Sequence, residues 1–100
     1  MKNEIVVISG MVLDESIRLS LGELCQFAKT SQECVIEMVE EGVLDPEGSS
    51  VYNWRFDHNA LKRLQIALHL QQDLGLNLPG SALVLDLLEE MEQLRRKLPD

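Results

Sequence analysis

The side chains that could catalyse a reaction or bind a metal are few in this sequence, and their spacing does not group them. His58 and His69 are eleven residues apart on a single expected helix, about three turns, so they cannot share a metal ion. Cys25 and Cys34 are nine residues apart, with no CxxC motif and no second Cys or His pair, whereas a zinc site needs about four ligands. Both cysteines lie in helically periodic apolar stretches, where a free thiol is usually a small core residue. We expect no metal and no cofactor.

Nucleophilic and acid–base chemistry have equally little support. Ser49 and Ser50 lie in an expected loop without a partner base, and the chain has no GxSxG motif and no glycine-rich phosphate loop. The paired acids at 40–41 and 89–90 could act as general acid and base. On helices, however, such pairs far more often form a solvated face. We therefore predict that this protein is not an enzyme.

A run of acidic residues that no basic residue interrupts is the most informative feature. Between Thr30 and Ser49 the chain has no lysine or arginine but six acids, which are Glu33, Glu37, Glu40, Glu41, Asp45 and Glu47. A helix that reads DNA must offset phosphate charge with lysine and arginine. The formal net charge of −8 also argues against nucleic acid or anionic lipid as the main partner, although acidity can serve solubility alone. We interpret the chain as a protein-binding module whose partner is basic.

Short β-prone runs come before and between the expected helices. Runs at 5–8 and 11–13 flank a Ser-Gly pair and predict a small hairpin, and 17–21 alternates like a half-buried strand. The apolar run behind Glu4 is too short for a signal peptide or a membrane span, so we expect a cytoplasmic protein. Residues 51–56 predict another strand, with aromatic rings at Tyr52, Trp54 and Phe56. We favour these rings as core residues of a small wing; alternatively Trp54 or Tyr52 is an exposed binding anchor.

Two short helices should follow one another in the first half of the chain. A capping box at Ser20–Glu23 opens the first helix. Either Ser31 or Thr30 caps the second, and Thr30–Glu33 has the spacing of another capping box; Gly42 ends that helix. Its acids share one face, opposite an apolar stripe, and Ile36 lies beside that acidic face.

Two longer helices should complete the chain. Asp57 caps a third helix that runs to about Leu74, and Asn77 caps a last helix with Pro79 in its first turn. Apolar residues on the last helix recur at the 3, 4, 3, 4 spacing of a heptad seam, at Val84, Leu87, Met91, Leu94 and Leu98. The seam is either a dimer interface or a face that packs on the chain's own core.

The order of these segments resembles the winged-helix head of MerR-type regulators. The segments that carry the resemblance are 21–25, 28–31 and 39–46 for the helix-turn-helix, 54–64 for the wing and third helix, and 74–78 for the turn before the dimerisation helix. The resemblance implies a mainly α fold, a MerR-like winged helix-turn-helix with small β elements and a C-terminal dimerisation helix. Those regulators usually carry arginine and tyrosine on the second helix, where this chain has Ile36, Glu37 and Met38. They also continue into a sensor segment, whereas this sequence ends at Asp100.

Within that superfamily the chain is more similar to the family of the chaperone modulator CbpM, through segments 20–25, 40–46, 54–58 and 74–80. The resemblance covers about residues 16–98. It implies a head at 16–78 and a dimerisation helix at 79–100, and it leaves 1–15 as an N-terminal extension, which includes the predicted hairpin. It further implies a homodimer without catalysis or cofactor, which binds the J-domain of a DnaJ-like co-chaperone of the CbpA type and inhibits its co-chaperone activity with DnaK.

The candidate site residues combine this resemblance with the charge pattern. J-domains present a basic helix to DnaK, so an inhibitor should offer acids together with a few apolar anchors. Our candidates for partner binding are Glu33, Ile36, Glu37, Glu40, Glu41 and Trp54, and Glu89, Glu90 and Glu92 form a competing surface. For the dimer interface the candidates are Val84, Leu87, Met91, Leu94 and Leu98.

Two other interpretations stay open. The chain could be a MerR-like DNA-binding transcriptional regulator without an effector domain, contacting phosphates through Lys29, Arg55, Lys62 and Arg63. It could also be a bare dimerisation scaffold with no partner surface.

Overall fold

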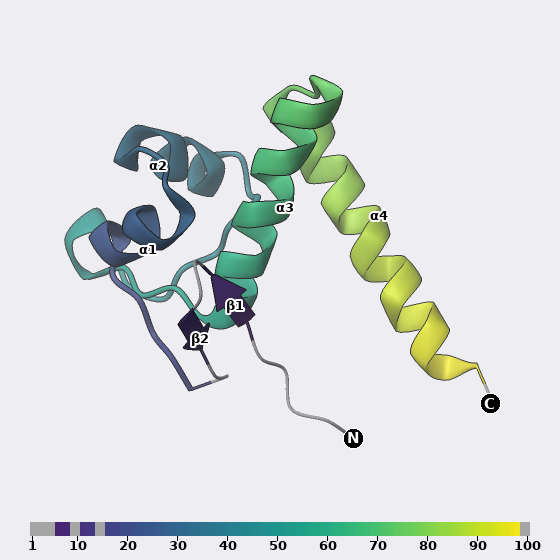
Figure 1. Cartoon of the computed structure of the whole chain (residues 1–100), viewed down its shortest axis with the longest axis horizontal. Coiled ribbons are helices and arrows are strands. Elements are labelled where there is room, and N and C mark those ends of the chain that lie inside the picture. The colour runs from purple at the N-terminus through teal and green to yellow at the C-terminus, as the bar shows by residue number, and fades with distance from the viewer. Residues whose placement is uncertain (1–5, 9–10, 14–15, 99–100) are drawn as a thin grey trace.

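The protein is mainly helical. The computed structural model describes residues 6–8, 11–13 and 16–98. Strands β1 (Val6–Ile8) and β2 (Met11–Leu13) pair antiparallel. The helices are α1 (Leu21–Ala28), α2 (Gln32–Glu40), α3 (His58–Leu74) and α4 (Leu78–Lys97), and a 3₁₀ turn, η1 (Val51–Asn53), lies between α2 and α3 (Figure 1).

Most helix ends have the predicted caps. The Ser20 hydroxyl accepts a hydrogen bond from the Glu23 amide at 3.2 Å, and the Glu23 carboxylate accepts one from the Ser20 amide at 2.9 Å, which completes the capping box. The side chains of Asp57 and Asn77 accept first-turn amides of α3 and α4 at 2.9 and 2.8 Å. Gly75 ends α3 in the left-handed region, at φ 68°, as expected for a C-cap glycine.

The start of α2 differs from the second predicted capping box. Ser31 is the N-cap, and its hydroxyl accepts the Cys34 amide at 3.1 Å. Thr30 instead belongs to the end of α1, where Lys29 turns left-handed and the Thr30 amide donates to the Cys25 carbonyl at 3.1 Å. Because the termination of α1 uses Thr30, the Thr30–Glu33 capping box is wrong.

The predicted strands at 17–21 and 51–56 are also wrong. The described chain has only isolated bridges there, Leu19 with Phe56 and Glu47 with Arg55. Inside the Glu47–Arg55 bridge, the Asn53 side-chain oxygen accepts hydrogen bonds from the amides of Ser49 and Ser50, and the segment forms η1. A local turn therefore replaces the extended wing strand that the alternating rings suggested.

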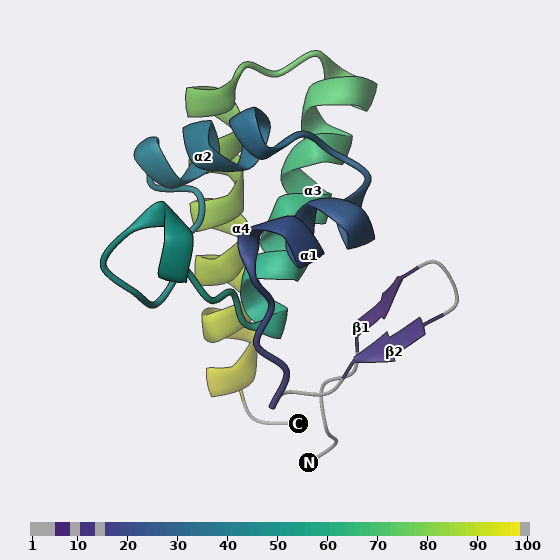
Figure 2. The same cartoon turned by 90° about the vertical axis from the view of Figure 1, so that its left-hand side faces the viewer.

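The core lies between α1, α2 and α3. Leu24, Val35, Phe56, Leu61 and Leu64 are all fully buried there. From α4 the buried residues come from its first half only. Figures 1 and 2 show α4 folding back along α3 as an antiparallel hairpin, with its C-terminal half away from α1 and α2. Within the described ranges, no helix is both long and apolar enough to cross a membrane.

Candidate protein-interaction surfaces

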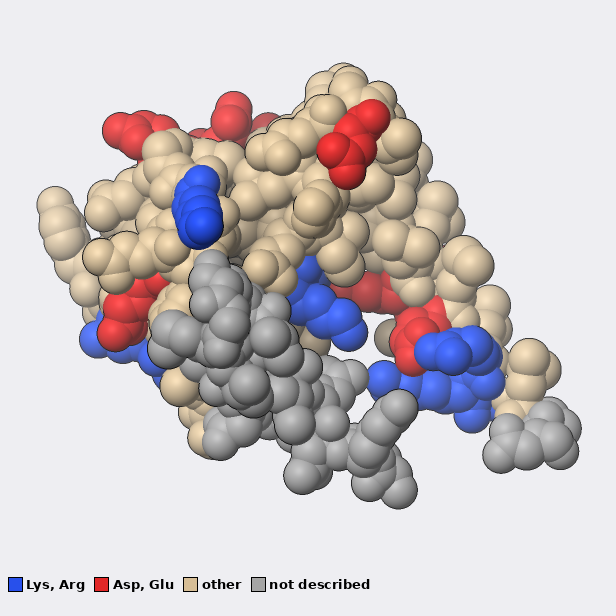
Figure 3. All heavy atoms as spheres, in the orientation of Figure 1, with Lys and Arg blue, Asp and Glu red and all other residues tan. Residues whose placement is uncertain are grey.

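The outer face of α2 is uniformly acidic. Glu33, Glu37 and Glu40 are exposed and fall within an arc of about 60° at 3.6 residues per turn, opposite the buried Val35 and Met38. Glu41, the C-cap, is exposed as well. Figure 3 shows carboxylates along the edge of the molecule over α2. We call Glu33, Glu37, Glu40 and Glu41 the α2 acidic face.

The charges of the α2 acidic face are not neutralised. Over residues 16–98, none of its four carboxylates pairs with a basic side chain. Glu33 and Glu37 are four residues apart, as are Glu37 and Glu41, and like charges at this spacing repel. Three of these acids, Glu37, Glu40 and Glu41, also lie towards the C-terminal end of α2, where the helix dipole is negative and the last turn has no basic residue. The face is thus held at an electrostatic cost, and its negative field would attract a basic surface.

The two apolar candidates for partner binding are only partly exposed to solvent. Ile36 and Trp54 are half-buried and pack against the core. The Trp54 ring meets the buried Phe56 ring edge-on, with centroids 6.0 Å apart at 84°. Phe56 is therefore a core residue, as favoured above, and Trp54 packs half-buried against it. The favoured prediction that Tyr52 is a core ring is wrong, since 95% of it is exposed.

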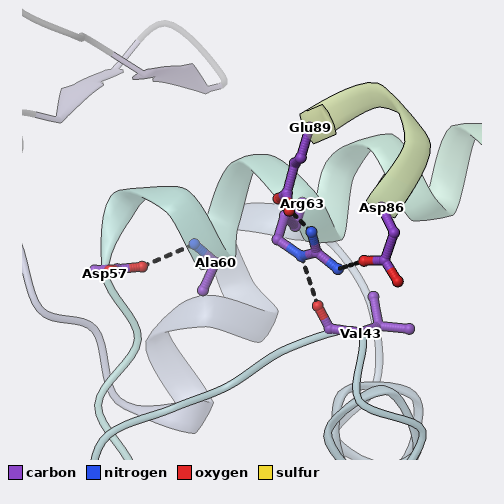
Figure 4. A network of polar contacts seen from close by, with 6 residues as sticks. All are labelled: Val43, Asp57, Ala60, Arg63, Asp86 and Glu89. Atoms are coloured by element: carbon purple, nitrogen blue, oxygen red, sulfur yellow. Dashed lines mark hydrogen bonds and ion pairs between the residues drawn. The ribbon is translucent and has the colours of Figure 1, made fainter. Parts of the chain in front are cut away.

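Arg63 joins three segments of the fold, and its side chain is only 18% exposed. Its Nε donates to the Val43 carbonyl at 2.7 Å, just after α2, and its Nη2 lies 3.6 Å from Asp86 on α4. Its Nη1 bonds Glu89, also on α4 (Figure 4). The sequence pattern placed Arg63 among possible phosphate contacts, and no local signal reveals these partners because they lie 20 or more positions away.

The competing acidic surface on α4 is neutralised in large part. Glu89 pairs with Arg63, and Glu92 pairs with Arg95 and Arg96. The hydrogen bond from Arg95 lowers the pKa of the Glu92 carboxyl and raises that of the guanidinium. Figure 3 accordingly shows basic and acidic groups interleaved towards the C-terminal end of α4. Over residues 16–98 the α2 acidic face has no such partners, and this difference separates the two surfaces.

The heptad seam of α4 is exposed along most of its length. Val84 is half-buried, but the exposed fractions rise to 50% at Leu87, 63% at Met91, 58% at Leu94 and 69% at Leu98. The seam lies about 140° around the helix from the buried side at Leu78, Ser81 and Leu85. Packing on the chain's own core, one of the two alternatives for the seam, is therefore wrong from Leu87 onward.

The cysteines and histidines stay apart. Cys25 is buried, and burial raises the pKa of its thiol, with smaller contributions from Cys34 and Glu33. His69 lies 3.5 Å from Asp73, one turn further along α3. Among the residues that the structure describes, no three His, Cys, Asp or Glu side chains gather as metal ligands.

Comparison with known proteins gives the family. Residues 19–100 match the family described as MerR HTH family regulatory protein. A relative from Coxiella burnetii (strain Dugway 5J108-111), named chaperone modulatory protein CbpM, is 42% identical over 92 residues, which span 92% of this chain and 87% of the relative. Proteins of the same name from Pseudomonas putida (strain F1) and Pseudomonas entomophila (strain L48) are 43% and 44% identical over 79 residues, spanning 79% of this chain and 78% of each relative. The chain therefore belongs to the MerR helix-turn-helix family of regulatory proteins and, within it, to the family of the chaperone modulatory protein CbpM.

Proposed function

We propose that this protein is a chaperone modulator that binds the J-domain of a DnaJ-like co-chaperone of the CbpA type and inhibits its co-chaperone activity with DnaK. The observation that carries the proposal is the α2 acidic face, four exposed carboxylates with no basic partner over residues 16–98. The name of the relatives, chaperone modulatory protein, supports the same class of function.

The chemistry of the α2 acidic face suits a basic helix. Complementary charge accelerates encounter and selects the partner, while affinity comes from a few desolvated apolar contacts. Ile36 and Trp54 can supply part of that contact, because each keeps some exposed surface beside the fold's core. An inhibitor bound in this way would cover the basic helix that the J-domain presents to DnaK.

The protein would act as a homodimer through α4. An exposed apolar seam over half a helix is the kind of surface that a second chain covers. In this arrangement residues 79–100 dimerise, residues 16–78 form the head that presents α2, and residues 1–15 are an extension. The α2 acidic faces of the two heads would both remain free for partners.

The test is kinetic. On a surface that carries the J-domain, Glu37→Lys with Glu40→Lys should slow association, most strongly at low salt, and change dissociation little. Ile36→Ala should instead speed dissociation if this side chain is an anchor. Glu90→Lys, at an exposed acid of α4, is the matched control and should behave as wild type. Inhibition is measured in parallel as loss of CbpA-stimulated ATP hydrolysis by DnaK.

Two results would contradict the proposal in different ways. If wild-type protein binds no J-domain at any salt concentration, the partner is wrong. If reversals at Glu37 and Glu40 leave both rates unchanged while reversals at Glu89 and Glu92 abolish binding, the partner stands and the site is wrong.

The alternative function is DNA binding, which the match to a helix-turn-helix regulatory family favours. Against it, the Arg63 guanidinium is occupied by Val43, Asp86 and Glu89. Arg55 donates to the Trp54 carbonyl at 2.8 Å. A mobility shift at low and physiological salt separates the two functions: tight binding to a selected duplex at physiological salt would favour a transcriptional regulator.

A further inference from the structure

The loop between α2 and α3 carries a large aromatic side chain that makes almost no contact within the fold. Tyr52 is 95% exposed and Val51, next to it in η1, is also exposed. Figures 1 and 2 show this loop at the same end of the molecule as α2, away from the C-terminal half of α4. A large aromatic ring so placed offers contact area that folding leaves free.

The backbone beneath Tyr52 is ordered before any partner arrives. Glu47 and Arg55 close the base of the loop with two backbone hydrogen bonds of 3.0 and 2.9 Å. Inside it the Asn53 side-chain oxygen accepts the Ser49 and Ser50 amides at 3.0 and 2.9 Å. Gly48, at φ 113°, lets the chain close on itself, because a Cβ there would lie 2.5 Å from the Asn53 carbonyl oxygen. Such a loop binds with little loss of backbone entropy, and a tyrosine adds few rotatable bonds.

The charges around the loop indicate which kind of partner side chain would contact the Tyr52 ring. From Thr30 to Trp54 the chain has acids but no lysine or arginine. At the base, Arg18 lies 3.5 Å from Glu47, and Arg55 folds back on the Trp54 carbonyl. The tip is thus a neutral aromatic group at the border of a negative field. A lysine or arginine side chain attracted by the α2 acidic face would find a π face at Tyr52.

We propose that Tyr52 is a second anchor for the basic helix that meets the α2 acidic face, with the Tyr52 ring covering a lysine or arginine at the edge of that helix. The α2 acidic face supplies steering, and the ring supplies a desolvated contact that slows dissociation. This inference rests on the proposed function, since it assigns a further contact to the same partner.

The experiment compares Tyr52 variants of the full-length protein on the immobilised J-domain. Tyr52→Ala should weaken binding roughly tenfold, mainly through faster dissociation, as expected for loss of an aromatic anchor. Tyr52→Phe keeps the ring and should stay within about threefold of wild type. Asn53→Ala keeps the ring but loosens the loop, and should fall between them. The matched control is Leu74→Ala, which removes an exposed apolar side chain at the end of α3.

The outcomes separate this inference from the proposed function. If wild-type protein binds the J-domain and Tyr52→Ala binds equally well, the anchor is refuted and the partner stands. If wild-type protein does not bind, the proposed function fails and the anchor with it. If Tyr52→Ala instead reduces self-association in sedimentation, the ring meets a second copy of the chain and the anchor is refuted. Thermal unfolding should be unchanged in Tyr52→Ala, because the ring makes almost no contact within the fold.

Discussion

Replacing Glu37 by glutamine should stabilise the protein and at the same time weaken its binding to the partner. Glu37 lies four residues from both Glu33 and Glu41, and relief of two such like-charge pairs is worth about 0.4–1 kcal/mol. Its charge also opposes the dipole near the C-terminal end of α2, a further ~0.3–1 kcal/mol. Glutamine keeps the length and the helix propensity of glutamate. We therefore expect the free energy of unfolding to rise by about 0.7–2 kcal/mol.

Thermal unfolding followed by circular dichroism measures the gain. In a domain of this size 1 kcal/mol corresponds to roughly 4–8 °C in Tm, well above the precision of the method. Because the effect is electrostatic and at the surface, it should shrink strongly at about 1 M salt. Association with the immobilised J-domain should be slower in the same variant. Glu90→Gln, on α4, is the control: it relieves only one such pair, with Asp86, and should leave association unchanged.

Two results would refute this reasoning. A Tm that is unchanged or lower at low salt would mean that the α2 acidic face is not under the repulsion that its spacing implies. A higher Tm with an unchanged association rate would mean that the face is strained but does not meet the partner.

Three further outcomes are expected. Leu87→Glu with Leu94→Glu removes four half-exposed leucines per dimer, about 3–6 kcal/mol in total, so the dimer Kd should rise by roughly a hundredfold or more in sedimentation; a monomeric wild-type protein would contradict the dimer. Arg63→Ala should lower the free energy of unfolding in urea by about 1–3 kcal/mol, because it leaves a carbonyl and two carboxylates without their donor. Cys25 should be alkylated slowly near neutral pH and more readily as pH rises towards its raised pKa, since burial leaves little thiolate; mass spectrometry should show Cys34 modified first.

The helix ends were predictable because capping is a local interaction. Ser20, Asp57 and Asn77 each accept an amide three residues ahead, so four residues of sequence contain both partners. Between α1 and α2 the sequence offers two adjacent N-cap candidates, Thr30 and Ser31. Because the left-handed end of α1 uses Thr30, Ser31 is the N-cap of α2, and local spacing alone does not show this. The strand predictions at 17–21 and 51–56 were wrong for another reason. The Leu19–Phe56 bridge joins segments far apart in the sequence, and the Asn53 side chain stabilises a turn in place of a strand.

The sequence predicted which residues form the candidate surfaces, but not which other side chains those residues contact. Alternation of acidic and apolar positions identified the outer face of α2, and heptad spacing identified the seam of α4. The pairs of Glu92 with Arg95 and Arg96 are local, but the sequence could not show that Arg63 of α3 reaches Asp86 and Glu89 of α4. It also could not show that, over residues 16–98, no basic side chain pairs with the acids of α2. Nor could it show that Trp54 packs beside Phe56 whereas Tyr52, two residues earlier, is exposed.

If the proposed function holds, the distribution of charge explains how a helix-turn-helix would serve a protein partner. A DNA reader needs its basic groups outside, free to reach phosphates. Here the guanidinium of Arg63 points into the fold and ties the end of α2 to α4, and Arg18 pairs with Glu47 at the base of the loop. The carboxylates of α2 take the outer position, and in the described part of the chain no basic side chain pairs with them. With basic groups that stabilise the fold and acids that face outward, the domain would keep the helix-turn-helix shape and attract a basic partner in place of phosphate.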